Sequence, residues 1–138
     1  MASGKGSTCI SDLLDLFFQN TSLSWAGNAD LYVSLHTANP SASGAQNTSE
    51  ANYTSYARQP VVRTSSGWTV SSGVVSNAAA INFPSATGGS STVTYVGIGT
   101  ALTGAGELLY FGALNSSLAV SSGVQPIFPV GALQIAET

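Results

Sequence analysis

The single histidine, His36, is the first residue to consider for catalysis. A Ser–His–Asp arrangement would need it beside a serine and an acid. His36 falls in the alternating segment Asp30–Thr37, on the face opposite Leu35, and the chain holds no Gly-x-Ser-x-Gly elbow that would present a serine nucleophile. The pattern therefore favours a plain strand histidine over a catalytic one.

The acids and the single cysteine do not form a recognisable metal or acid–base site. A metal would need more clustered ligands than Cys9, His36 and the scattered carboxylates supply. Asp12 and Asp15 lie early in a short expected helix, where acids stabilise the N-terminal end of the helix dipole. We therefore predict no metal site and no catalytic residues.

Two glycine-containing segments, Gly97–Thr100 and Gly104–Gly106, superficially resemble a nucleotide-binding loop. Such a loop requires Gly-x-Gly-x-x-Gly at the start of a helix. Leu102 stands in the place of the third glycine, and no helix is expected to begin there. Turn and bulge glycines explain the pattern better. We predict no bound cofactor and no enzymatic activity.

Aromatic residues offer a different kind of chemistry. Trp25, Tyr53, Tyr56, Trp68 and Tyr95 could stack on a sugar, although tryptophan and tyrosine are equally suited to cores and protein interfaces. The sequence favours core or interface positions, and it leaves a carbohydrate-binding β-sandwich as the weaker alternative.

A partner protein is the expected ligand of this chain. Its candidate contacts are a lysine near the N-terminus, apolar residues of the expected helix and two aromatic anchors: Lys5, Leu13, Phe17, Phe18, Trp25 and Tyr53.

Charge is scarce, and this restricts the possible functions. From Thr64 to Thr138 the chain has no lysine, arginine or histidine, and its only acids there are Glu107 and Glu137. Charged residues are 7% of the whole chain, against roughly 25% in ordinary domains.

A net charge of −3 with three cations excludes a basic surface for nucleic acid or anionic membrane. No apolar run is long enough to span a bilayer. A neutral, Ser/Thr-rich surface that packs against copies of itself predicts a structural subunit and a homo-oligomer.

The candidate contact residues lie in two expected parts of the chain, an N-terminal arm and a folded domain. Residues 1–10 are expected to be a flexible N-terminal arm, and residues 11–138 a single β-sandwich domain with an N-terminal helix at 11–20. Leucines and phenylalanines give that helix a wide apolar face. We expect part of this face to cover an open end or edge of the sandwich, and the rest, with the arm, to contact a neighbouring subunit.

The remainder of the chain has the pattern of an all-β protein. Short alternating segments with turn signals every 8–12 residues predict a jelly-roll-like antiparallel β-sandwich of about eight to nine strands. Pro60 places its segment at a sheet edge or a bulge. The ten segments from which these strands are expected to form are 30–37, 56–64, 67–71, 73–76, 78–83, 92–100, 107–114, 117–121, 125–128 and 131–136.

A set of short motifs follows in order along the chain from about residue 11. It includes Leu31–Pro40, Tyr56–Arg58, Gly67–Val70, Phe83–Pro84, Gly97–Ala101, Gly104–Tyr110 and Gly112–Leu114. Taken in this order, the motifs resemble a family of small virion structural proteins of tailed bacteriophages, and the resemblance covers nearly the whole chain. The family has Asp where Asn39 stands, and these residues are interchangeable in such a turn.

The resemblance implies a virion protein, assembled in the cytoplasm of the bacterial host, with no catalytic residue to transfer. Members are described as tail-fibre-like or simply as phage structural proteins, and some phage shells carry on their outside a small β-sandwich protein of this size, called a cement or decoration protein; the chain resembles either. Small size and the absence of a shaft favour cement, with the major capsid protein and copies of itself as partners, because fibres usually show long repeats or coiled coils. A tail-associated or tail-fibre-like adaptor is the alternative.

Overall fold

The computed structural model describes residues 3–137 of the 138-residue chain. Within this range it has one helix and ten strands. In chain order these are β1 (Ser3–Lys5), α1 (Ser7–Gln19), β2 (Asp30–His36), β3 (Gln59–Val62), β4 (Trp68–Ser71), β5 (Val74–Asn77), β6 (Ile81–Asn82), β7 (Ser90–Gly99), β8 (Leu108–Ser121), β9 (Ile127–Phe128) and β10 (Gln134–Ala136).

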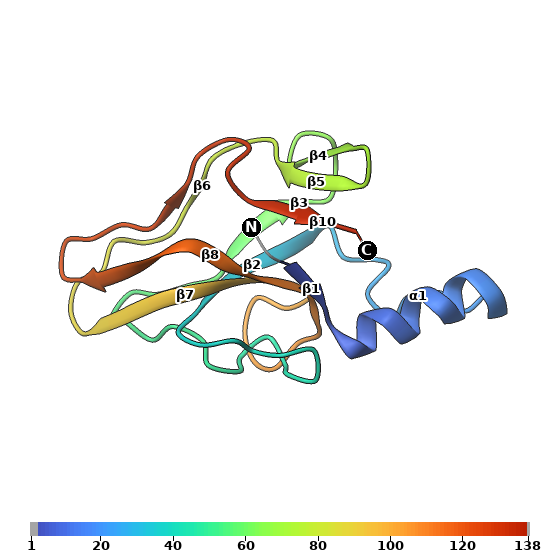
Figure 1. Cartoon of the computed structure of the whole chain (residues 1–138), viewed down its shortest axis with the longest axis horizontal. Helices are drawn as coiled ribbons and strands as arrows, with labels where there is room; N and C mark the ends of the chain where they lie inside the picture. Colours follow the sequence, from blue (N-terminus) through green and yellow to red (C-terminus); the bar gives the residue numbers. More distant parts are fainter. Residues whose placement is uncertain (1–2, 138) are drawn as a thin grey trace.

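The strands form three antiparallel sheets. The largest has the order β1-β8-β7-β2-β3, and the smaller ones have the orders β10-β5-β4 and β6-β9. Figure 1 shows the two smaller sheets on one side of the long strands β7 and β8. The predicted all-β class with one short helix is confirmed. The finer jelly-roll designation stays a prediction.

The core lies between the large sheet and the two smaller sheets with their connecting segments. Alternation along β2 and β7 directs one set of side chains to this interior, and segments around β6 and β10 supply the other. The most deeply buried apolar members are Val33, Leu35, Val93, Val96, Val120, Phe83 and Leu133.

Local turn chemistry determines the β4–β5 hairpin, as predicted. Ser72 and Gly73 both have positive φ, 52° and 77°, which a two-residue turn of the hairpin type requires. The turn places Ser71 opposite Val74 in the ladder. The prediction that Pro60 marks an edge strand is also confirmed, because β3 is the outermost strand of the large sheet.

One prediction about strands was wrong. Residues 107–114 and 117–121 were expected to be two strands, but they form the single 14-residue strand β8. Pairing with β7 passes from Val93↔Leu118 directly to Tyr95↔Ala113, so the polar stretch between them is a bulge inside one strand. The serines and asparagine of that stretch give a turn-like sequence without ending the strand.

The N-terminal segment also differs from the prediction. A flexible arm was expected through residue 10, and residues 1–2 of it lie outside the described part of the chain. The next residues form β1, which pairs with β8 through Lys5↔Tyr110. Gly6 passes so close to β8 that a Cβ atom there would lie 1.9 Å from the Leu108 carbonyl oxygen. The arm is thus held by main-chain pairing, which its Gly/Ser-rich sequence does not reveal.

Helix α1 begins four residues earlier than the expected start at Ser11. The backbone N–H of Ser7 donates to the Ala42 carbonyl at 2.7 Å, and this bond fixes the first turn. The end of the helix agrees with the prediction, since Asn20 adopts the left-handed conformation with φ 53° and donates its backbone N–H to the Asp15 carbonyl.

Candidate functional site

Helix α1 carries two apolar stripes. Each residue of a helix advances by about 100°, so Cys9, Leu13 and Leu16 share one side and face the body of the protein. Cys9 is buried at 5% exposure, and the two leucines are partly buried. This inner stripe is the part of the helix that serves its own fold.

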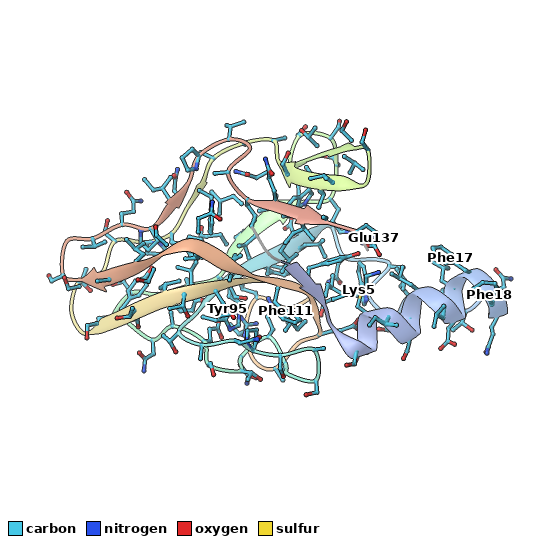
Figure 2. The ribbon with its side chains drawn as sticks, in the orientation of Figure 1. Lys5, Phe17, Phe18, Tyr95, Phe111 and Glu137 are labelled. Atoms are coloured by element: carbon cyan, nitrogen blue, oxygen red, sulfur yellow. The ribbon has the colours of Figure 1, made fainter. Side chains whose placement is uncertain are left out.

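The second stripe is directed away from the body, and we call it the outward stripe. It consists of Ile10, Leu14, Phe17 and Phe18, with exposed fractions of 44%, 52%, 70% and 81%. Figure 2 shows the two phenylalanines near the free end of α1, far from the sheets. The spacing i, i+4, i+7, i+8 is that of helices that dock into grooves. Predicted contacts Phe17 and Phe18 therefore lie on an accessible surface, whereas Leu13 lies on the inner stripe.

The helix does not lie along the edge of a sheet, which was one of the two places predicted for it. Figure 1 shows α1 extending away from the sheets, and the outermost strand beside β8 is β1. Because the short strand takes over edge protection, the outward stripe has no partner within the described residues.

The base of the helix is fixed to the C-terminal end of the chain. The Lys5 ammonium pairs with the Glu137 carboxylate, which also accepts a hydrogen bond from the Tyr110 hydroxyl. The ammonium lies 5.9 Å from the centre of the Tyr110 ring. Figure 2 shows Lys5 and Glu137 beside the start of α1. Lys5, predicted to contact a partner, is thus already paired within its own chain.

Trp25, another predicted contact, is half-buried next to this base. Its ring lies 4.9 Å below the Arg63 guanidinium, which in turn donates to the Asn28 carbonyl at 2.8 Å. The Trp25 Nε1 atom is buried, and no acceptor within residues 3–137 lies at ordinary hydrogen-bonding distance and angle, although the indole N–H is close enough to Glu107 to favour its charged form. Trp25 therefore connects the helix base to β3 and presents little surface to a partner.

Glu107 is the one carboxyl group near the helix base whose titration is strongly perturbed. The pKa of Glu107 is raised to about 7, mainly by burial. The negative charge of Asp12 and a hydrogen bond between the two carboxyl groups also raise this pKa, while the Trp25 side chain lowers it. Burial, assisted by the charge of Glu107, raises the pKa of the Cys9 thiol to about 11. Cys9 is therefore a protonated, unreactive thiol at neutral pH.

Tyr53 is a core residue, and its prediction as a partner contact is not compatible with its position. It is 2% exposed, its hydroxyl donates to the Pro84 carbonyl at 2.9 Å, and its ring meets that of Tyr56 edge-on at 5.5 Å. None of the five aromatics considered for sugar stacking is exposed. The structure thus assembles no open aromatic platform from them.

His36 is part of a buried hydrogen-bonded arrangement. Its Nδ1 lies 2.8 Å from the Thr48 carbonyl, which can only accept, so Nδ1 carries the proton and Nε2 accepts from the Ser34 hydroxyl at 2.8 Å. Burial lowers the His36 pKa, although the bond to Thr48 opposes this. Both side chains of the pair are fully buried, so substrate cannot reach them, and His36 holds the loop after β2 in place.

A second buried polar group was not found from the sequence. Arg58 is 4% exposed and binds both carboxylate oxygens of Glu50, at 2.7 and 2.8 Å. Its remaining N–H groups donate to the carbonyls of Ala101 and Gly104. The Tyr56 hydroxyl donates to Glu50 at 2.6 Å, and burial together with this bond raises the Tyr56 pKa. These contacts join two loops that lie far apart in the sequence, which no local spacing signals.

The structure also contains an apolar cleft of about 530 Å³, which the sequence did not predict. It lies between the face of the large sheet and the β4–β5 hairpin. Its lining includes Leu31, Ile98, Trp68, Val70, Val75 and Arg63. The size and apolar character are those of ligand- and side-chain-binding sites.

Other functional classes receive no positive indication. Within residues 3–137 no group of three or more His, Cys, Asp or Glu side chains could hold a metal ion. In the same part of the chain, no helix is long and apolar enough to cross a membrane.

Comparison with known proteins identifies the family. The model of the family described as podophage GP4 fiber I protein gp80 matches residues 7–136, a range that includes all of α1 and reaches the end of β10. No curated protein sequence matches the chain. The match confirms the resemblance to virion structural proteins of tailed phages. Because it covers most of the chain, this protein belongs to the podophage GP4 fiber I protein gp80 family.

Proposed function

We propose that this chain is a non-enzymatic structural subunit of a phage tail fibre, and that it attaches to its neighbours through the outward stripe of α1. The observation that carries the proposal is the exposure of Phe17 and Phe18, 70% and 81%, at the end of a helix that extends away from the sheets. Exposed apolar stripes of this kind mark protein interaction sites.

The family description supports a fibre over a capsid role. Sequence reasoning favoured capsid cement because the chain is short and has no shaft, but the matching family is one of fibre proteins. A fibre can be built from compact subunits joined by side-chain contacts, so a shaft within the chain is not required. The proposed location is the virion, after assembly in the cytoplasm of the bacterial host.

The proposed partners are copies of this chain and neighbouring tail proteins, with no role for nucleic acid or membrane. Each cation supports this, because each is already engaged: Lys5 with Glu137, Arg58 with Glu50, and Arg63 with main-chain carbonyls. Two phenylalanines bury about 300–500 Å² together. Fully burying two such side chains contributes about 3–6 kcal/mol before the costs of association. The outward stripe therefore supplies the kind of apolar anchor around which an interface is built.

Locating the protein on intact particles tests the proposal. Particles are labelled with an antibody against the chain and imaged, and copies per particle are counted on a quantitative gel. Label confined to the tail region, with tens of copies, is the expected result. Label spread over the whole capsid with hundreds of copies would establish the cement role instead.

A further inference from the structure

The structure holds two apolar features of opposite shape, each without a partner within the described residues. One is the outward stripe of α1, which protrudes. The other is the cleft between the large sheet and the β4–β5 hairpin, which is open and about 530 Å³ in volume. Both would lose water on contact with apolar surface, which is favourable.

The chain cannot bring its own helix into its own cleft. The helix runs away from the sheets, and Figure 2 shows Phe17 and Phe18 at its far end. The helix base is fixed by the Ser7–Ala42 hydrogen bond and the Lys5–Glu137 ion pair. A contact between the two features must therefore form between different copies.

The two surfaces also match in chemistry. The cleft is lined mainly by aliphatic and aromatic side chains from β2, β4, β5 and β7, so it suits leucine and phenylalanine side chains. Val70 lies at its opening, with 76% of its surface exposed. The outward stripe presents four apolar side chains along two turns, which is the pattern of a helix that fills a groove.

Charge supports the same pairing. Helix α1 has no basic residue and carries Asp15 beside the outward stripe, whereas Asp12 lies on the inner side of the helix near Glu107. Arg63 lines the cleft, and within residues 3–137 no carboxylate pairs with it. The Arg63 guanidinium donates only to neutral main-chain carbonyls, so its charge is not neutralised, and a nearby acidic side chain of the helix would be electrostatically complementary to it and would orient the helix as it docks.

We propose that the outward stripe of α1 in one copy occupies the apolar cleft of a second copy. This inference rests on the proposed role as a fibre subunit and names the contact that joins neighbouring subunits. The interface is heterologous, because each copy gives a helix to one contact and a cleft to another. Helices that paired with each other would leave the cleft empty.

Complementation between two variants tests the proposal in solution. Val70→Asp places a charge at the cleft opening and leaves the helix intact, while Phe17→Ser with Phe18→Ser removes the helix anchors and leaves the cleft intact. Self-association of the full chain is followed by analytical ultracentrifugation. We expect each variant alone to associate about 30-fold more weakly than the wild type, the loss typical of an interface hot spot. An equimolar mixture regains one helix-in-cleft contact and forms a 1:1 complex.

The control is Leu102→Asp, at a leucine that is 51% exposed and does not line the cleft. It should associate as the wild type does. Wild-type-like association of Val70→Asp, or a mixture that stays monomeric, would overturn the proposal. So would a wild-type chain that does not self-associate. Particle labelling separately reports whether the chain is a fibre subunit, so the two failures can be told apart.

Cross-linking gives a second measurement that does not depend on weakened binding. Copies with Phe18→Cys are mixed with copies with Val70→Cys and oxidised; native Cys9 is buried and stays reduced. A disulfide between residues 18 and 70 of different copies is expected. Predominant 18–18 disulfides would show that the helices pair with each other and would contradict the proposal.

Discussion

Arg58 donates two hydrogen bonds of nearly equal length to Glu50, from Nε to Oε2 at 2.7 Å and from Nη2 to Oε1 at 2.8 Å. The arginine side chain is 3% exposed and the glutamate side chain 15%. The pair joins the loop between β2 and β3 to the loop between β7 and β8. It therefore fixes the irregular part of the molecule without contributing to the outward stripe or the cleft.

Replacing Arg58 by Met should lower the free energy of unfolding by about 3–5 kcal/mol, because Glu50 is left buried without its countercharge. Urea denaturation followed by tryptophan fluorescence measures the loss. The matched control is the double substitution Arg58→Met with Glu50→Gln, which removes both charges and should recover part of the stability. If the single variant matches the wild type within about 0.5 kcal/mol, the ion pair has no structural role.

Glu107 should make the protein more stable in mild acid than in mild base. Its pKa is raised to about 7 in the folded chain from 4.5. Between these values the folded state binds more protons than the unfolded state, so its contribution to stability falls as pH rises from about 4.5 to 7. The melting-temperature difference between wild type and Glu107→Gln, measured from pH 5 to pH 8, should therefore favour the wild type most at pH 5. A difference that is constant with pH would contradict the assignment.

His36 should make the protein less stable in mild acid, which is the opposite of the effect of Glu107. Burial lowers its pKa below the ordinary 6.5, so the unfolded state gains a proton first as pH falls, and stability is lost below about pH 6.5. His36→Asn should remove this loss and should cost about 1–3 kcal/mol at pH 8 through broken buried hydrogen bonds. The His36→Asn variant should still be incorporated into particles at the wild-type level, measured on virions at neutral pH. Loss of incorporation by a fully folded variant would instead indicate a functional histidine.

Removal of residues 1–6 should destabilise the domain, because it deletes β1 and exposes the edge of β8 at Tyr110 to Gly112. It also breaks the Lys5–Glu137 pair. A lower melting temperature and increased light scattering are expected. Phe17→Ser with Phe18→Ser is the comparison, since these side chains are exposed and their loss should change stability by about 0.5 kcal/mol or less. Equal melting temperatures for the deletion and the wild type would refute the role of β1.

Sequence reasoning succeeded where a few neighbouring residues determine the conformation. Ser72 and Gly73 supply the positive φ angles of a hairpin turn, and Asn20 ends the helix. The alternation of β2 is likewise local. The apolar excess of the helix predicted a partner contact; Phe17 and Phe18 are exposed, and the contact itself stays a prediction.

The remaining features depend on contacts between distant segments. Tyrosine is a residue type that is common at interfaces, yet Tyr53 lies in the core, where its hydroxyl donates to the Pro84 carbonyl. The Gly/Ser-rich start of the chain has no strand pattern of its own, and it becomes a strand only because β8 offers an unpaired edge. The cleft is formed by side chains from β2, β4, β5, β7 and β8 together. No window along the sequence contains these relationships.

The Lys5–Glu137 ion pair spans 132 positions of the chain, and this has a consequence for biosynthesis. During translation β1 has no partner until β8 has left the ribosome, and the ion pair cannot form before Glu137 has been made. Pairing between such distant segments is slow compared with local contacts. The helix would therefore reach its fixed, protruding orientation only after Glu137 has been translated, and chains terminated before that residue would not present it correctly. Recruitment into the fibre would in this way be restricted to chains that include Glu137.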